Sequence, residues 1–139
     1  MALTSTNIFV NLHVKDLKNT IAFFTGLGFE FNQQFTDEQA ACLVLGENMY
    51  AMLLTEPFFK SFTKREIVDT EKYAQLTIAL SAESREKVDE IVNAAAALGG
   101  KLYSEPVDHG FMYQWGFQDL DGHIWEIAYM NMNAFDQQA

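Results

Sequence analysis

The stretch Phe117-Gln118-Asp119-Leu120-Asp121-Gly122-His123-Ile124-Trp125-Glu126-Ile127 is typical of a strand, a turn rich in Asp and Gly, and a second strand. Alternation along the second strand places Glu126 on one face, between Ile124 and Ala128. A carboxylate with apolar neighbours is either exposed at a sheet edge or faces a cavity in which its charge has a role. Glu126 is therefore the first candidate for a functional residue.

The whole chain consists of two similar halves, and this stretch closes the second. Each half begins with a strand and a polar residue that caps a helix, Asp16 in the first half and Ser84 in the second. Glycine ends each helix, at Gly28 and at Gly99, and three further strands follow. Because an internal repeat outweighs any local motif, we predict an α+β fold built from tandem βαβββ modules.

The boundaries of these parts follow from the same signals. The predicted parts are residues 7–56 for the first module, 57–72 for a connecting segment and 73–132 for the second module, within a single domain of residues 1–139. The predicted strands are residues 8–14, 29–35, 40–45, 49–55, 73–82, 101–104, 111–118 and 123–130. The connecting segment lacks glycine and contains several aromatic residues, so we expect a short helix and a loop.

Composition and charge exclude several classes of partner. The 139 residues, 49% of them hydrophobic, are enough for one globular domain with a substantial core. A formal net charge of −10 argues against nucleic acid and against an anionic membrane surface. Residues 1–7 lack a basic segment followed by an apolar run, and no stretch approaches the roughly 20 apolar residues that span a bilayer. We therefore expect a cytoplasmic protein without nucleic-acid or membrane partners.

Several short motifs occur in an order known from one family. Val14-Lys15-Asp16-Leu17 opens the first helix, Leu27-Gly28-Phe29 ends it, and Asp119-Leu120-Asp121-Gly122 precedes the strand that carries Glu126. Together with the tandem βαβββ modules, they resemble the vicinal oxygen chelate superfamily, which includes glyoxalase I, bleomycin- and fosfomycin-resistance proteins and extradiol dioxygenases. The likeness covers nearly the whole chain. It implies a glyoxalase-like, curved and partly closed mixed sheet around a ligand cavity, and usually a homodimer.

The resemblance also implies where a metal ion would be held. Metal-dependent members take one ligand from the first strand and one from the last strand of each module, which here gives Phe9, Leu53, Thr77 and Glu126. Only Glu126 is an ordinary metal ligand, so we expect no metal site and no other cofactor. A divalent metal held in an atypical way by Glu126 and the loop residue His109 stays open as an alternative.

Strand alternation and the resemblance together predict a cavity for a small molecule. Its expected lining residues are Phe9, Asn11, His13, Leu53, Gln75, Thr77, Trp115, Phe117 and Glu126. In a different interpretation, the polar members of this set hydrogen-bond one another within a filled core.

Two functions fit such a cavity, and the sequence leaves the choice between them open. A binding protein would bind or sequester an aromatic or amphipathic ligand by stacking, and the negative charge would favour a cationic or neutral molecule. The alternative is a lyase or isomerase of the glyoxalase type, either metal-free with Glu126 as general base or with an atypical divalent metal. A single carboxylate in a pocket serves both functions, and it does not identify the ligand.

Overall fold

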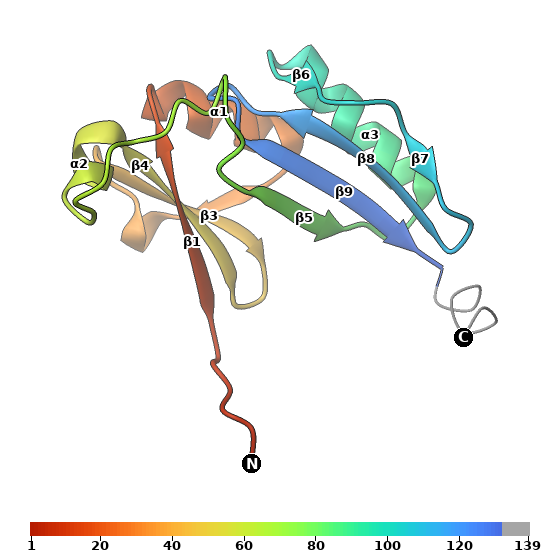
Figure 1. The fold of residues 1–139 in the computed structure, drawn as a ribbon, viewed down its shortest axis with the longest axis horizontal. Helices are drawn as coiled ribbons and strands as arrows, with labels where there is room; N and C mark the ends of the chain where they lie inside the picture. Colours follow the sequence, from red (N-terminus) through yellow and green to blue (C-terminus); the bar gives the residue numbers. More distant parts are fainter. Residues whose placement is uncertain (132–139) are drawn as a thin grey trace. The chain divides into compact units, whose positions relative to one another are not determined.

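The chain divides into two compact units, Met1–Ile67 and Val68–Ala139. The structure is a computed structural model that describes residues 1–131 (Figure 1). The boundary between the units falls inside the predicted connecting segment, residues 57–72. The predicted end of the second module, residue 132, lies just outside the described residues.

The first unit contains a four-stranded mixed sheet with the strand order β1-β4-β3-β2. Its elements are β1 (Ile8–Val14), α1 (Leu17–Leu27), β2 (Glu30–Asn32), the 3-10 helix η1 (Gln33–Phe35), β3 (Ala40–Gly46), β4 (Met49–Thr55) and α2 (Glu56–Lys60). β1 pairs parallel with β4, and the other neighbours pair antiparallel. The parallel pair requires a crossover, which α1 supplies, so the predicted βαβββ order is confirmed for this unit.

Local capping sets the bounds of these elements. The Asp16 carboxylate accepts a hydrogen bond from the backbone N–H of Asn19 at 3.1 Å, which satisfies a free donor at the start of α1. At the other end Gly28 adopts φ = 107°, a left-handed conformation that suits glycine. β2 is shorter than the predicted strand 29–35, because the Asn32 side chain accepts from the N–H of Gln34 at 3.0 Å and turns the chain into η1.

The second unit contains a mixed sheet of five strands. Its elements are β5 (Thr77–Ser81), α3 (Arg85–Ala97), β6 (Lys101–Leu102), β7 (Val107–Asp108), β8 (Met112–Gln118) and β9 (Ile124–Met130). β5 pairs parallel with β9, β9 pairs antiparallel with β8, and the outer edge of β8 pairs antiparallel with both β6 and β7. The second half thus repeats the first, except that two short strands replace the predicted strand 101–104.

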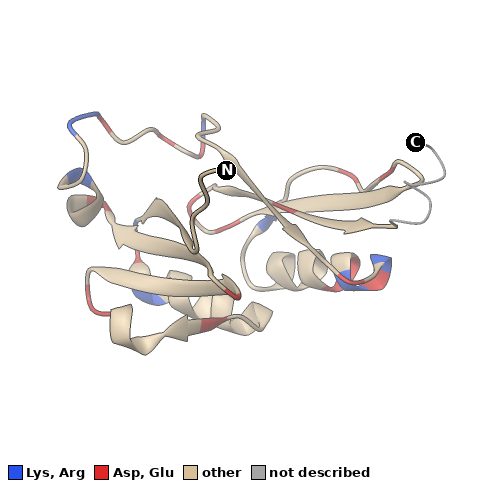
Figure 2. Ribbon diagram, turned by 90° about the horizontal axis from the view of Figure 1, so that it is seen from below, with Lys and Arg blue, Asp and Glu red and all other residues tan. Residues whose placement is uncertain are grey.

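One face of each sheet carries a helix and a hydrophobic core. In the first unit, Phe23 and Phe24 of α1 are buried, as is Leu12 of β1. In the second unit, α3 packs across β8 and β9 on one side of the sheet (Figure 2). Trp125 is fully buried on this side. The opposite face of the second sheet carries Glu126, and the opposite face of the first sheet carries Phe9 and Asn11. No helix within residues 1–131 is long and apolar enough to cross a membrane.

Candidate functional site

The turn between β8 and β9 is built around the buried carboxylate of Asp119. One oxygen, Oδ1, accepts hydrogen bonds from the backbone N–H groups of Asp121 at 2.9 Å and His123 at 3.0 Å. The other, Oδ2, accepts from the indole Nε1–H of Trp125 at 2.9 Å. Burial raises the pKa of Asp119, whereas His123 and the hydrogen bond from Trp125 act in the opposite direction. Asp119 therefore ties the turn to the first half of β9.

The connecting segment packs directly on this turn. The Thr70 hydroxyl donates to the backbone carbonyl of Asp121 at 2.7 Å, and Thr70 is buried. Gly122 has φ = 86°, and a Cβ at this position would lie 2.6 Å from the carbonyl oxygen of Thr70. Only glycine fits this close approach to Thr70. Gly122 is thus required both by its positive φ and by the packing of the connecting segment.

The register of the second sheet decides which side chains surround Glu126. Glu126 pairs with Gly116 of β8 on one side and with Ala79 of β5 on the other. Beyond Gly116, the backbone N–H of Tyr103 donates to the Gly116 carbonyl at 3.3 Å and continues the pairing of β6 with β8. Tyr103, Gly116, Glu126 and Ala79 therefore form one row across the sheet. Glu126 stands between two positions with almost no side chain.

This row lies on the face of the sheet opposite α3. Residues paired across a sheet point to the same side, so the register identifies the members of this face on the three long strands. They are Thr77, Ala79 and Ser81 of β5, Met112, Gln114, Gly116 and Gln118 of β8, and Ile124, Glu126, Ala128 and Met130 of β9. Glu126 is the one charged residue among them. We call these residues the Glu126 face.

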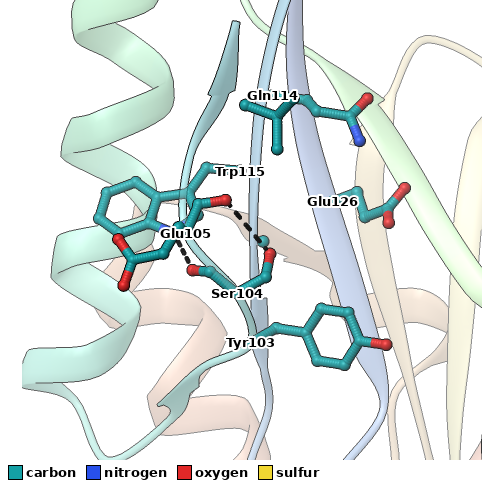
Figure 3. A pocket seen from close by; sticks show the side chains of 8 residues that line it. Tyr103, Ser104, Glu105, Gln114, Trp115 and Glu126 are labelled. Atoms are coloured by element: carbon teal, nitrogen blue, oxygen red, sulfur yellow. Dashed lines mark hydrogen bonds between the residues drawn. The ribbon is translucent and has the colours of Figure 1, made fainter.

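A pocket opens at the edge of this face, where the chain between β6 and β7 leaves β8. It is a shallow recess with a cavity volume of about 20 Å³. The lining residues are Tyr103, Ser104, Glu105, Val107, Gln114, Trp115, Gly116 and Glu126. Figure 3 shows Gln114 and Glu126 on one side of β8 and the Trp115 indole on the other, where its Nε1–H donates to the Ser104 carbonyl at 2.6 Å. The indole thus holds the loop that forms the rim of the pocket.

Charged and aromatic side chains fasten the β7–β8 hairpin to α3. The Arg85 guanidinium donates to the Asp108 carboxylate at 2.6 Å and lies 5.2 Å from the centre of the Tyr113 ring. The hydrogen bond from Arg85 lowers the pKa of Asp108. The Tyr113 hydroxyl donates to Asp89 at 2.6 Å, and this bond raises the pKa of Tyr113 to about 12. These contacts fix the strand that carries Gln114 and Gly116.

Trp115 and Phe117, predicted as cavity walls together with Glu126, lie on the other face. Trp115 pairs with Ile127, and Phe117 pairs with Trp125, on the side that α3 covers. Phe117 is fully buried and stacks on the Trp125 ring at 6.4 Å between centroids. The prediction that Trp115 and Phe117 share a face with Glu126 is therefore wrong, because Glu126 pairs with Gly116, which lies between them on β8. Phe117 is a core residue, and Trp115 reaches the pocket only at its rim.

Leu53 was predicted to line the cavity together with Phe9, but in the first unit it lies on the opposite face of the sheet. β4 pairs with β1 so that Leu53 lies beside Leu12, whereas Phe9 lies beside Tyr50. Leu53 is fully buried on the α1 side of the sheet, and Phe9 points to the opposite side. The sequence could not reveal this difference of one residue, because the helical crossover between the strands hides the register.

The remaining candidates of the first unit have different environments. Phe9 is 54% exposed and stacks on Tyr50 with 5.0 Å between ring centroids. Asn11 is exposed two residues further along β1. His13 is only 3% exposed, because α2 covers it, with Phe59 edge-on at 5.5 Å and Glu56 at 3.5 Å from Nδ1. Phe9 and Asn11 are thus available to a ligand on this unit, whereas His13 is enclosed.

In the second unit, Thr77 begins β5 on the Glu126 face and is exposed. Gln75 precedes the strand and is exposed as well, because β5 is shorter than the predicted strand 73–82. Sequence reasoning missed Tyr103 and Gln114. Gln114 lies two residues from Gly116 on β8, so alternation would have placed both on the same face of the strand. Tyr103 follows a strand of only two residues, which is too short for alternation to identify.

The family model for the glyoxalase/bleomycin resistance protein/dioxygenase superfamily matches residues 8–127. The chain belongs to this superfamily. No curated protein matches the sequence significantly. The solved structures similar to this member of the superfamily support the same fold.

Three solved structures illustrate the similarity. A hypothetical protein from S. aureus is 28% identical, with a TM-score of 0.77 over 91% of this chain and 95% of that one. A glyoxalase-related enzyme from Fulvimarina pelagi is 18% identical, with a TM-score of 0.77 over 91% and 88%. The fosfomycin resistance protein FosX from Listeria monocytogenes, in complex with Mn(II) and sulfate, is 21% identical, with a TM-score of 0.70 over 98% of each chain.

The donor set of this superfamily member does not fit a divalent metal ion of the usual kind. Of the four positions implied by the resemblance, Phe9 and Leu53 offer no lone pairs and Thr77 offers only a hydroxyl. Within residues 1–131, no three His, Cys, Asp or Glu side chains gather as a metal would require. His109 is fixed beside Met112, because its backbone N–H donates to the Met112 carbonyl at 2.7 Å, and this position is remote from Glu126. Met112 pairs with Met130, four residues or about 13 Å along β9 from Glu126.

Proposed function

We propose that this superfamily member binds or sequesters a small aromatic or amphipathic molecule and does so without the usual metal centre. One observation carries the proposal: Glu126 stands beside Gly116 on the face opposite α3, next to a shallow pocket. Its cavity volume is only about 20 Å³, far below the roughly 300–1,000 Å³ typical of sites for drug-sized ligands. It therefore suits one end of a ligand, and the rest of the ligand would extend over the Glu126 face.

The character of this face supports binding. Its small and neutral polar side chains leave backbone and amide groups accessible, and Tyr103 offers an aromatic surface at the rim. A few polar groups that converge on a partly apolar surface are typical of small-molecule sites. The negative net charge of −10 favours a cationic or neutral ligand over an anion.

The alternative function is a lyase or isomerase of the glyoxalase type. In this case Glu126 would act as general base and remove a proton from a carbon next to a carbonyl group. Gly116 favours the idea, because the absence of a side chain there lets a substrate carbon approach the carboxylate. The same enzyme class with an atypical divalent metal belongs to this alternative.

Two measurements distinguish these functions. Thermal unfolding is followed during titration with nickel, zinc, manganese and iron(II), and then with indole, p-cresol and benzylamine. A ligand-dependent rise in unfolding temperature without any response to metals is the expected result. A metal-dependent rise that Glu126→Ala abolishes would refute the metal-free proposal. For any compound that is also converted, loss of turnover with unchanged affinity in Glu126→Gln would assign catalysis to the carboxylate.

We further propose a homodimer located in the cytoplasm. Ile8, Phe9 and Met49 expose large apolar side chains on β1 and β4, and such surfaces often mark protein contacts. The superfamily resemblance implies the same assembly. Sedimentation equilibrium tests it: the expected mass is twice that of one chain, and Phe9→Ser should shift the equilibrium towards the monomer. A monomeric wild-type protein at micromolar concentration would exclude the dimer.

A further inference from the structure

The row Tyr103, Gly116 and Glu126 leaves a narrow slot over the middle of three strands. The N–H of Tyr103 donates to the carbonyl of Gly116, and Gly116 pairs with Glu126. Neighbouring strands lie about 4.8 Å apart, so the Cα atoms of Tyr103 and Glu126 are separated by about 10 Å. Gly116 contributes no side chain to fill this distance. An aromatic ring and a carboxylate thus border a slot with a backbone floor.

The floor of the slot is held open by backbone packing. A Cβ at Gly116 would lie 2.9 Å from the carbonyl oxygen of Trp125 and 3.6 Å from Cγ of Glu126. On the far side of Glu126, the paired residue is Ala79, whose side chain is a single methyl group. The Glu126 carboxylate therefore has space on both sides. The space between it and the Tyr103 ring is part of the pocket.

The chemistry of the slot selects against anions and metal ions. The pocket lining includes Glu105 and Glu126 and no Lys or Arg. The Glu126 carboxylate lies on the side of the Tyr103 ring, whereas the Glu105 side chain extends towards the Trp115 indole (Figure 3). Lys101 lies on the same face but one row further along, where it pairs with Gln118. A metal ion needs several lone-pair donors, whereas an organic ammonium group needs only a negative field and a surface to contact. The face of an aromatic ring within about 6 Å of a cation supplies such a surface.

We propose that this slot binds a protonated amine or quaternary ammonium group between the Tyr103 ring and the Glu126 carboxylate. The inference rests on the proposed function as a small-molecule binder and names the charged end of its ligand. Gln114, on the same face, offers an amide oxygen to an N–H of the ligand. The remainder of the ligand extends from the slot across the small side chains of β5 and β9.

Choline and its uncharged carbon analogue, in which carbon replaces the quaternary nitrogen, provide the test. Both are titrated into the full-length protein at low ionic strength, and backbone amide chemical shifts are followed by NMR. We expect choline to bind with a dissociation constant in the millimolar range and to shift the amides of Gly116 and Glu126. The carbon analogue should bind about tenfold more weakly, because it lacks the charge.

Two variants and two matched controls assign the contacts. Glu126→Gln and Tyr103→Leu should each weaken choline binding by about tenfold or more. Glu83→Gln removes one negative charge from an exposed position, and Tyr73→Leu removes an exposed ring, so both controls should keep the wild-type affinity. The amide spectrum of each variant verifies that it is folded.

Three results would overturn the slot. They are equal affinity for choline and its carbon analogue, choline binding that Glu126→Gln leaves unchanged, and Mn(II) that binds at Glu126 and is not displaced by choline. The first two leave the proposed function standing, whereas Mn(II) binding at Glu126 would also refute its metal-free part. A neutral aromatic compound that stabilises the protein independently of Glu126 would uphold small-molecule binding while refuting the ammonium slot.

Discussion

Replacing Asp119 by Asn should destabilise the protein although the two side chains are nearly identical in shape. The Asp119 carboxylate accepts three hydrogen bonds, from the N–H groups of Asp121 and His123 and from the Trp125 indole. An amide has one oxygen only. If this oxygen faces the two backbone donors, the amide N–H2 lies against the indole N–H, and two buried donors confront each other without an acceptor.

The size of the effect follows from these contacts. The hydrogen bond to the indole is lost, which costs about 1.5–3 kcal/mol for a charged acceptor, and the two backbone bonds weaken because the acceptor becomes neutral. The burial that raises the pKa of Asp119 works in the opposite direction, since the neutral amide avoids burying a charge. We expect a net loss of about 2–4 kcal/mol in the free energy of unfolding. The unfolding temperature should fall by roughly 10 °C.

A double-mutant cycle with Trp125→Phe isolates the responsible contact. The free energy of unfolding is measured by urea denaturation for the wild type, Asp119→Asn, Trp125→Phe and the double variant. Phenylalanine removes the indole N–H, so Asp119→Asn should be less harmful in that background, with a coupling energy of about 1–2 kcal/mol. Effects that add to within about 0.5 kcal/mol would refute the assigned contact. So would an Asp119→Asn variant as stable as the wild type.

Two further changes probe the second unit, and a third, in the first unit, serves as a control. Gly122→Ala places a Cβ against the Thr70 carbonyl and should cost about 2–4 kcal/mol in urea denaturation, whereas Gly28→Ala, at φ = 107° with nothing within 4 Å, should cost only about 1–2 kcal/mol. Equal losses would contradict the contact with Thr70. Ultraviolet titration should find one of the five tyrosines ionising at about 12, and this transition should disappear in Tyr113→Phe. Because the folded-state pKa of Tyr113 is raised from 10.0, its contribution to stability is complete below that pH and lost as the pH rises through about 12.

The order of elements could be predicted from sequence because its signals are local. The caps Asp16 and Ser84 and the stop at Gly28 act within a few residues of the chain, and the structure confirms each of them. The short strand β7 escaped prediction, since a strand of two residues has no alternation to detect. Gln33–Phe35 left the predicted strand because a side chain of Asn32 competes with the sheet for the backbone.

The candidate site was harder to predict because it depends on register. Alternation divides the residues of one strand between two faces. It does not reveal which residues of the neighbouring strand lie on the same side of the sheet. A difference of one residue in a connection exchanges the faces, and this moved Leu53, Trp115 and Phe117 to the core side. Glu126 was identified correctly as a carboxylate among small and apolar neighbours, because this property belongs to its own strand. The positions of Tyr103 and Gly116 beside Glu126 follow only from the strand pairing in the structure.

The two carboxylates of the stretch from Phe117 to Ile127 have separate tasks that depend on each other. Asp119 holds the turn and the Trp125 indole, and thereby sets the register in which Gly116 faces Glu126. A slip of one residue would turn Trp125 outward and bring Glu126 against α3, where an unpaired charge would cost several kcal/mol. The turn is therefore part of the site, although it does not line the pocket. A ligand at Glu126 would be sensitive to Asp119 through register, without any contact between them.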